Sequence, residues 1–240
     1  MWLLLCSSDD HPALWAARRL GARGLSPLLV LTPELLHYSF KWSHRLGNTD
    51  HPSIEFTLAD GLRVRGEEIR GVLNRMPVLP SRLVSGLPAA DRAYALQEWA
   101  ALHISWLSSL QVPVLNLPVV NGLGGAWHSH AQWTWFAARA GLATPPFREE
   151  PASPLQRPTP ILAPGGSCQA FVVDGEVAGN DLPAHVRNGL CRLAELARIR
   201  LIGVSLEPGT HRFLGATPRP DLRLGGDALL DALSRALSVG

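Results

Sequence analysis

The stretch WLLLCSSDDHPALWAARRLGARGLSPLLVLT, residues 2–32, decides the fold. Its apolar opening, WLLLC, predicts a buried strand, and the polar residues 7–10 supply a turn and a helix cap. An amphipathic helix follows and is expected to end at Gly24, before the second apolar run PLLVLT, residues 27–32. A strand, a helix and a strand in this order predict a β-α-β unit. Such units build parallel sheets covered by helices, so the sequence predicts an α/β protein.

Composition bounds the size and the partners. The chain has 240 residues, of which 46% are hydrophobic, so it can form one large or two small domains with a real core. The net charge is only +2 and the basic residues are scattered, which gives no electrostatic footprint for nucleic acid or for an anionic membrane. Lys41 is the only lysine among the 22 basic residues, so a mechanism that needs two lysines on a nucleotide is excluded.

The cysteines and the apolar stretches indicate a reducing compartment. Cys6, Cys168 and Cys191 are odd in number and show no CxxC spacing, which favours neither a disulfide framework nor a zinc site. The opening MWLLLCSSDD is too short and turns acidic too soon for a signal peptide, and no stretch is long enough to span a membrane. We therefore expect a cytoplasmic protein.

Polar residues at predicted strand ends are the candidate ligand-binding residues. The run GVLN, residues 71–74, predicts a strand that ends in Asn74 and is followed by Arg75, and VPVLN ends a later strand at Asn116. Carboxyl ends of strands in open α/β sheets border the usual ligand crevice, although an arginine in this position is often simply solvated. Glu98 lies on a long predicted helix, residues 89–110, and faces either solvent or this site.

Other elements follow from spacing and turn residues. Aromatic and apolar residues recur at helical spacing in the long helix and are expected in the core: Tyr94, Trp99, Leu102 and Trp106. Hairpins are predicted to turn at Asp60-Gly61 and at Asp174-Gly175. The glycine-rich VVNGLGG, residues 119–125, is interpreted as a flexible loop. The alternative is a loop that binds phosphate, but its glycine spacing matches neither the P-loop nor the dinucleotide-binding motif. His128 and His130 are two apart, which is unsuited to chelation from a helix.

Domain boundaries follow from the proline-rich segment REEPASPLQRPTP, residues 148–160. We expect an open-sheet α/β domain with an entry helix to the following region over residues 1–146, a linker over residues 147–164, and a small α+β domain over residues 165–240.

Taken in order, these segments resemble the ATP-grasp superfamily of carboxylate-amine ligases, especially the branch with ribosomal-protein glutamate ligases and the maturation enzymes of ribosomally made, modified peptides. The carrying segments are LLLCSSDDHPALWAARRLGARG, GVLNRMP, YALQEWAALHISWLSSLQVPVLNLP and HSHAQWTWFAARAGLATPP. The resemblance implies a pre-ATP-grasp-like open-sheet domain followed by a reduced α+β ATP-grasp-like domain.

The departures from the family pattern concern the nucleotide and its metal. The family places a lysine in the helix that is HSHAQWTWFAARAGL here, and a phosphate-binding arginine where CQAFVVDGEV has Gln169. The subdomain with the glycine-rich phosphate lid is expected to be missing. The family motif that supplies an Asp, a Glu and an Asn for magnesium corresponds to GVSLEPGTHRFLGATPRP, in which Ser205, Gly215 and Thr217 take those places.

The sequence thus favours a catalytically degenerate ATP-grasp-like protein without a metal or a cofactor. It would bind a carboxylate-bearing peptide or small molecule near Asn74, Arg75, Glu98 and Asn116, or act as the partner of an active maturation enzyme. One alternative is an active ligase that binds ATP and magnesium through non-standard residues such as Glu207 and Asp221. Another is an interaction module without a small-molecule site.

Overall fold

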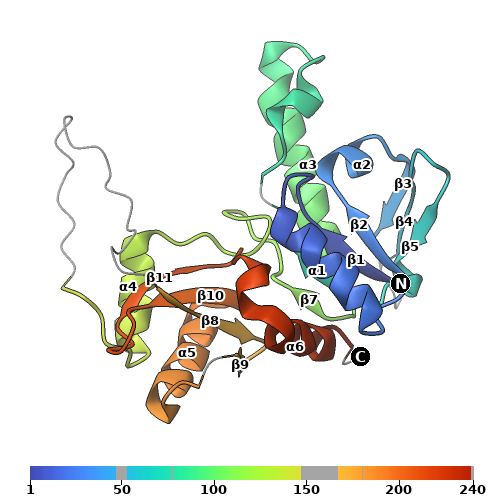
Figure 1. Ribbon diagram of the computed structural model, residues 1–240. Helices are drawn as coiled ribbons and strands as arrows, with labels where there is room; N and C mark the ends of the chain where they lie inside the picture. The colour runs from blue at the N-terminus through green and yellow to red at the C-terminus, as the bar shows by residue number, and fades with distance from the viewer. Residues whose placement is uncertain (47–52, 77, 147–166, 180, 239–240) are drawn as a thin grey trace. The chain divides into compact units, whose positions relative to one another are not determined.

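The computed structural model describes residues 1–46, 53–76, 78–146, 167–179 and 181–238 (Figure 1). The chain divides into two compact units, unit 1 with Met1–Ala126 and Leu230–Gly240, and unit 2 with Trp127–Leu229. Each unit is mixed α/β, in agreement with the predicted fold class. No helix among the described residues has both the length and the apolar character needed to cross a membrane.

The two units differ from the predicted domains in two places. Helix α4, His130–Arg139, belongs to unit 2, whereas the prediction placed it in the domain of residues 1–146. Helix α6, Gly226–Ser238, begins in unit 2 and ends in unit 1. The end of α6 packs on the first strand, because the Trp2 indole donates a hydrogen bond of 3.2 Å to the Leu237 carbonyl. The predicted linker, residues 147–164, lies outside the described residues.

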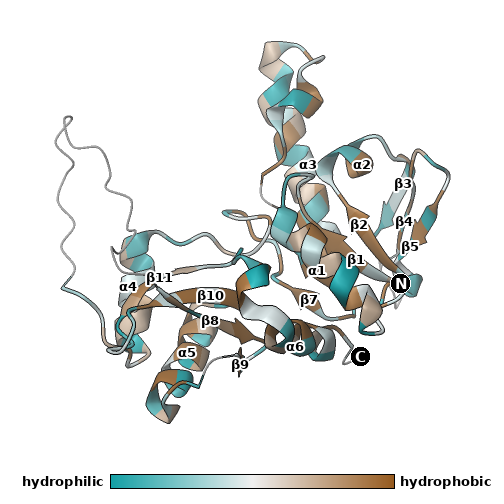
Figure 2. Cartoon of the chain, in the orientation of Figure 1, coloured by the Kyte–Doolittle hydropathy of each residue, from teal (hydrophilic) through white to brown (hydrophobic). Residues whose placement is uncertain are grey.

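Unit 1 contains the predicted parallel sheet. Its four strands are β1 Trp2–Leu5, β2 Leu28–Leu31, β6 Gly71–Asn74 and β7 Val114–Leu115. They run parallel in the order β2-β1-β6-β7, and β1 is buried along its whole length. Figure 2 shows β1 and β2 as strongly hydrophobic. This is the near-continuous apolar pattern expected of a parallel sheet covered on both faces.

Helix α1, His11–Ala22, connects β1 to β2. Asp10 caps it, because its side chain accepts a hydrogen bond of 3.0 Å from the Ala13 amide. The helix ends two residues before the predicted Gly24, which has a φ of +95° and turns the chain toward β2. The β-α-β unit of residues 2–32 is therefore confirmed.

A second, antiparallel sheet of unit 1 follows the short helix α2, Pro33–His37. Its strands are β3 Phe40–Arg45, β4 Ser53–Thr57 and β5 Arg63–Arg65, in that order. The β4-β5 hairpin was predicted, but β3 was not. Of the predicted turn pair only Gly61 has a positive φ, of +91°, so the turn is not the predicted type I′.

Helix α3, Ala89–Ser109, is confirmed, but one of its aromatic residues is not in the core. Trp106 is buried, whereas Tyr94 is 64% exposed. Figure 1 shows why, since the first half of α3 projects beyond the sheet together with η2, Ser81–Val84. Helical periodicity predicts one apolar face but does not tell how far along the helix that face is covered.

The core of unit 1 lies between the second half of α3 and the two sheets. Trp42 stacks on Phe56 with a centroid distance of 4.5 Å, and Trp106 meets both rings edge-on. His103 is also buried here. Because aromatic rings carry large apolar area, this cluster contributes much of the packing energy of the unit.

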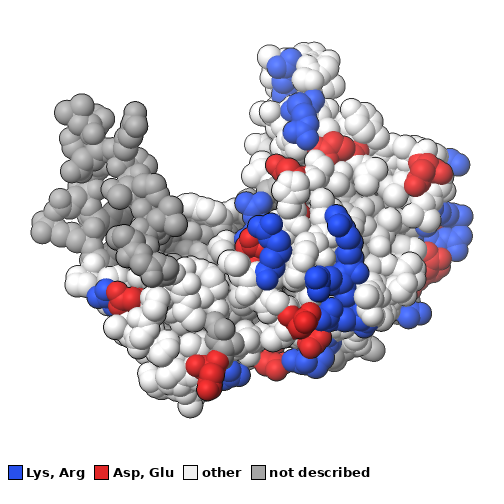
Figure 3. Space-filling model, viewed as in Figure 1, with Lys and Arg blue, Asp and Glu red and all other residues white. Residues whose placement is uncertain are grey.

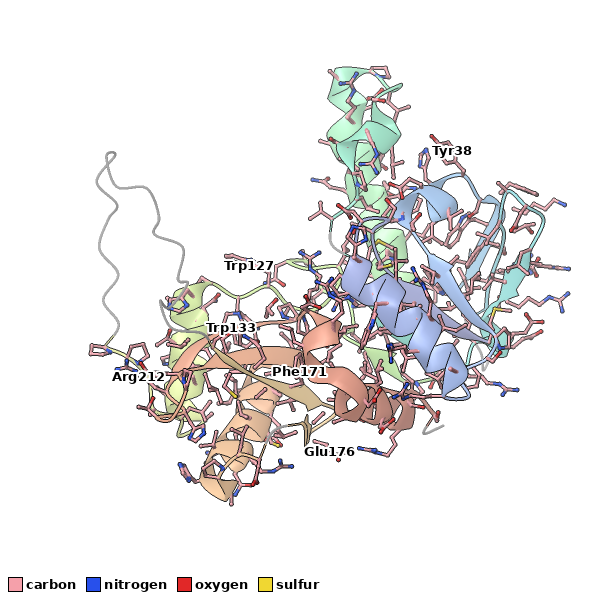
Figure 4. All side chains as sticks on the ribbon, viewed as in Figure 1. Tyr38, Trp127, Trp133, Phe171, Glu176 and Arg212 are labelled. Carbon is pink, nitrogen blue, oxygen red and sulfur yellow. The ribbon has the colours of Figure 1, made fainter. Side chains whose placement is uncertain are left out.

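Unit 2 has one antiparallel sheet in the order β11-β10-β8-β9 among its described residues. Its elements besides α4 are β8 Cys168–Val173, β9 Glu176–Ala178, α5 Ala184–Ala197, β10 Leu201–Leu206, β11 Phe213–Thr217 and η3 Leu222–Gly225. The predicted β8-β9 hairpin is confirmed, with positive φ at Asp174 and Gly175. Buried Trp133 and Phe171 come from α4 and β8 (Figure 4).

Candidate functional site

The carboxyl ends of β6 and β7 bring together three of the four predicted ligand-binding residues. Asn74, Arg75 and Asn116 are almost fully buried. The Asn74 amide nitrogen donates to the carbonyl oxygens of Asn116, at 2.8 Å, and Leu123, at 2.6 Å. Its amide oxygen accepts from the Met76 amide at 3.2 Å. Asn74 therefore joins two strand ends and the following loop.

Arg75 makes a bidentate contact with a carboxylate of the same chain. Its Nε lies 2.9 Å from Oδ2 of Asp10, and a terminal nitrogen lies 3.1 Å from Oδ1. The side chains are only 3% and 10% exposed. Asp10, which the sequence marked only as a capping residue, thus holds Arg75 and the start of α1 at once.

Cys6 lies beside this ion pair and is fully buried. Burial, followed by the negative charge of Asp10, raises the pKa of its thiol to about 12. A thiol with such a pKa is not a nucleophile at neutral pH. Cys6, Cys168 and Cys191 are present as thiols rather than in a disulfide.

Packing explains the glycine-rich turn. A Cβ at Gly124 would lie 2.7 Å from the Met76 carbonyl oxygen, and one at Gly125 would lie 3.0 Å from the Asn116 Cβ. Gly125 also has a φ of +110°. Asn116 itself adopts the left-handed region, with φ of +54°, which asparagine tolerates better than most residues. The turn needs glycine because it packs directly on the strand ends.

The fourth predicted residue, Glu98, lies apart from this network. It is an exposed residue of α3 and forms no hydrogen bond or ion pair with the other three predicted residues. The expectation that it faces either solvent or the site is resolved in favour of solvent.

The four positions at which the sequence departs from the family pattern share one face of the unit 2 sheet. Gln169 on β8 is opposite Ser205 on β10, and Ser205 is opposite Gly215 on β11. Thr217 lies two residues beyond Gly215 and therefore points to the same side. The Gln169 amide nitrogen is 2.8 Å from the Ser205 hydroxyl oxygen. We call Gln169, Ser205, Gly215 and Thr217 the polar row.

The polar row is partly open. Gln169, Ser205 and Gly215 are half-buried and Thr217 is exposed. A Cβ added at Gly215 would meet no atom within 4 Å, although one at Gly203, the residue opposite Thr217, would lie 2.4 Å from the Pro220 Cβ. The row thus has room for larger side chains at its centre, while the backbone is tightly packed at its edge.

The polar row does not fit magnesium. The ion prefers oxygen ligands with at least one carboxylate, and these four residues supply an amide, two hydroxyls and no carboxylate. Glu207, one proposed substitute, pairs with Arg212 at 2.8 Å where β11 begins (Figure 4). Asp221, the other, pairs with Arg223 at 2.5 Å. Among the described residues, no group of three His, Cys, Asp or Glu side chains is placed to hold a metal.

His128 and His130 serve local structure. His128 precedes α4, its Nε2 lies 3.2 Å from the Ala197 carbonyl oxygen, and its ring meets Trp133 edge-on at 5.0 Å. His130 opens α4, which Ser129 and Gln132 close in a reciprocal capping box.

Sequence reasoning missed two cavities. One, of about 490 Å³, is in unit 2 and borders Thr134, Trp135 and Pro145. The other, of about 770 Å³, is in unit 1 and borders Arg45, Arg63 and other polar residues of the second sheet. The alternation of polar and apolar residues in SIEFTLADGLRVRG was the available signal for the second cavity, because it assigns one face of the hairpin to polar side chains.

Comparison with known proteins identifies the fold. No family model and no curated protein matches the chain. Among solved structures, the macrocyclase MdnC of Microcystis aeruginosa MRC, bound with precursor peptide MdnA, has a TM-score of 0.69 at 13% identity over 100% of both chains. The ATP-grasp ligase PsnB, with a minimal precursor, has a TM-score of 0.66 at 15% identity over 98% of this chain and 97% of that chain.

A third structure extends the comparison to another organism. The RiPP-associated ATP-grasp ligase of Chryseobacterium gregarium, in complex with ADP and a leader and core peptide, has a TM-score of 0.64 at 10% identity over 99% of this chain and 95% of that chain. At such identities the likeness concerns the fold. The chain therefore has the fold of the ATP-grasp ligases associated with ribosomally made, modified peptides, as its sequence segments had suggested.

Proposed function

We propose that this chain is a catalytically inactive ATP-grasp-like protein that binds a peptide and assists an active maturation enzyme. The observation that carries the proposal is the polar row, in which uncharged Gln169 and Ser205 bond to each other next to Gly215. By the resemblance, these are positions for a phosphate-binding arginine and two carboxylate metal ligands.

The loss of charged side chains from the polar row bears directly on phosphoryl transfer. Phosphoryl transfer depends mainly on positioning and on stabilising negative charge with metal ions and cationic side chains. Removal of a single electrostatic donor from such a site typically costs about 10²-fold or more in rate. The loss of an arginine and two carboxylates from one sheet face therefore leaves too little charge to support transfer.

The peptide part of the proposal rests on the fold neighbours. MdnC, PsnB and the Chryseobacterium gregarium ligase were all solved with a precursor peptide or its leader and core. A chain that keeps this fold while its nucleotide positions change retains most of the surface available for peptide. The active partner would then supply the ATP-dependent step.

Isothermal titration with ATP and magnesium tests the inactive state. We expect no binding tighter than about millimolar, because the polar row offers no charge to a metal-bound triphosphate. An ADP-release assay with glutamate, with amino-acid mixtures and with acidic peptides should stay at background. A dissociation constant for ATP below about millimolar, or ADP release that depends on an acceptor, would show an active ligase instead.

A gain-of-function variant tests the assignment of the polar row. The triple change Ser205→Asp, Gly215→Glu and Thr217→Asn restores the family's ligands, and Gly215 has room for a side chain. We expect it to bind Mn²⁺, measured by water-proton relaxation, where the natural chain does not. The matched control, Ser205→Asn, Gly215→Gln and Thr217→Asn, has similar volume without the carboxylates. Equal behaviour of the two variants would contradict the assignment.

Peptide binding needs its own measurement. The folded chain should bind some members of a synthetic array of twelve-residue peptides that vary in charge and hydropathy, with affinities confirmed by fluorescence anisotropy. Failure to bind any of them would overturn the peptide part of the proposal and favour an interaction module without such a site.

A further inference from the structure

The second sheet of unit 1 has two chemically different faces. Alternate residues of its strands are buried against α3, among them Ile54, Phe56 and Val64. The intervening residues form a polar face on which Ser43, Glu55 and Arg65 lie in one row across β3, β4 and β5. Arg45 is in the next row, opposite Ser53. Figure 3 shows basic side chains gathered over this part of the molecule, with acidic ones among them.

Several of these polar residues line the cavity of about 770 Å³. Its charged lining residues are Arg45, Glu55, Arg63, Arg65 and Glu67. Ser109, the last residue of α3, and Gln111, two residues beyond it, add uncharged polar groups. A cavity of this size is within the range of ligand sites, and its lining carries three guanidinium groups and two carboxylates.

The guanidinium groups are not equally engaged. Arg63 is held by Glu55, with its Nε 2.6 Å from the carboxylate oxygen. Arg65 approaches Glu67 only at 3.9 Å, and the Glu67 side chain is 78% exposed, so this contact is weak. The Arg45 backbone pairs with Ser53 in the sheet, but the Arg45 side chain forms no hydrogen bond or ion pair with another described residue. Arg45 and Arg65 are therefore the cations of the cavity with capacity for a ligand.

We propose that this cavity binds an extended acidic peptide segment, with Arg45 and Arg65 receiving two separate carboxylates. The inference rests on the proposed peptide-binding function and moves its carboxylate recognition away from Arg75, which Asp10 already occupies. Guanidinium groups bind carboxylates through paired, charge-assisted hydrogen bonds.

Spacing favours two separate carboxylates over one compact anion. Arg45 is on β3 and Arg65 on β5, two strands apart and in neighbouring rows, or about 12 Å between backbones. Side chains four residues apart lie on the same face of an extended peptide and are separated by about 13 Å. A phosphate would concentrate its charge at one point of a cavity that also carries the carboxylates of Glu55 and Glu67, whereas two single charges can each lie beside one arginine.

Fluorescence anisotropy with defined peptides tests the proposal. The probe is a labelled twelve-residue peptide of alternating glutamate and serine, and its comparators contain glutamine or arginine in place of glutamate. We expect the glutamate peptide to bind at least tenfold more tightly than the glutamine peptide, and this preference to weaken with salt. Equal binding of the two peptides would overturn the proposal.

Charge reversal at the arginines provides the residue-level test. The double variant Arg45→Glu and Arg65→Glu should bind the glutamate peptide at least tenfold more weakly. Each charge-assisted contact that is lost should by itself lower the affinity about tenfold. It should also gain affinity for the arginine peptide. Arg192→Glu, at an exposed position of α5, is the control for general charge and should change binding less than twofold.

The outcomes separate this proposal from the proposed function. If the glutamate peptide binds equally to the double variant and to the Arg192→Glu control, the cavity is not the carboxylate site, although the chain remains a peptide-binding protein. Circular dichroism confirms that each variant is folded, and Arg45→Gln with Arg65→Gln repeats the test with less repulsion. Inorganic phosphate and glutarate are also compared as competitors of the glutamate peptide at equal ionic strength. If phosphate competes more strongly than glutarate, the cavity is a phosphate site and the proposal is contradicted.

Discussion

Two polar regions of the molecule differ in how their side chains are used. At the strand ends of unit 1, Asn74 and Arg75 are buried, Asp10 is nearly so, and the three bond to one another or to the adjacent backbone. On the unit 2 sheet, Gln169 and Ser205 are half-buried and share one hydrogen bond. The comparison shows that a position at the end of a strand is not enough to make a polar residue part of a ligand site. In this chain the buried network supports the fold, and we propose that the polar row is the place where nucleotide chemistry is gained or lost.

The largest expected effect is from Asp10→Ala. Removing this carboxylate leaves Arg75 buried without its anionic partner and takes the cap from α1, so we expect a loss of about 3–5 kcal/mol in the free energy of unfolding. Urea denaturation followed by tryptophan fluorescence measures it. Asp231→Ala, which breaks the more exposed pair of Arg23 and Asp231, is the control and should cost less than about 1 kcal/mol. Equal losses would remove the distinction between the buried network and the surface.

The second prediction concerns pH and His103. Burial lowers the pKa of His103 from 6.5 to about 4. In the unfolded chain the imidazole takes up a proton near its ordinary pKa while the native one does not, so stability should fall as the pH decreases from about 6.5 to about 4. The largest loss from this group is about 3 kcal/mol.

Stability measured by urea titration at several pH values in that window checks this expectation. The His103→Gln variant should lose part of the dependence, whereas His185→Gln, at an exposed position, should retain it. The idea fails if both variants keep the slope of the natural chain.

The third prediction compares the two regions directly. Asn74→Ala leaves the carbonyl oxygens of Asn116 and Leu123 without their buried donor and should cost about 2 kcal/mol. Gln169→Ala removes a donor from a half-buried hydroxyl and should cost less than about 1 kcal/mol. Thermal unfolding of both variants at neutral pH gives the difference. A larger loss from Gln169→Ala would reverse the assignment of structural and open regions.

The sequence predicted the helices and strands better than it predicted which residues contact each other. Residues 2–32 contain an apolar run, a cap, a helical pattern and a glycine, so local chemistry alone specified the β-α-β unit. The position of Asn74 at a strand end was also predictable. That its amide bonds Asn116 and Leu123, more than 40 residues away, depends on which strands neighbour each other, which local patterns do not encode. The same holds for Arg75 and Asp10. The sequence marked each residue separately but did not predict that the two form an ion pair.

Strand register explains the other half of the comparison. The family resemblance selected Gln169 from one segment and Ser205 and Gly215 from another, and the β8-β10-β11 register places them side by side. Strand β3 and the cavity beside it were missed because its residues, FKWSHR, do not alternate cleanly. A bulge between Phe40 and Ser43, with Lys41 at a φ of +59°, interrupts the pattern.

The smallest expected effect tests how open the polar row is. Gly215→Ala adds a methyl group where no atom lies within 4 Å, and we expect the free energy of unfolding to change by less than about 0.5 kcal/mol. Gly203→Ala adds the same methyl group 2.4 Å from the Pro220 Cβ and should cost about 1–3 kcal/mol through overpacking. Parallel urea titrations measure both. If Gly215→Ala is the more costly change, the row is closed, and restored carboxylates would have no room to bind a metal.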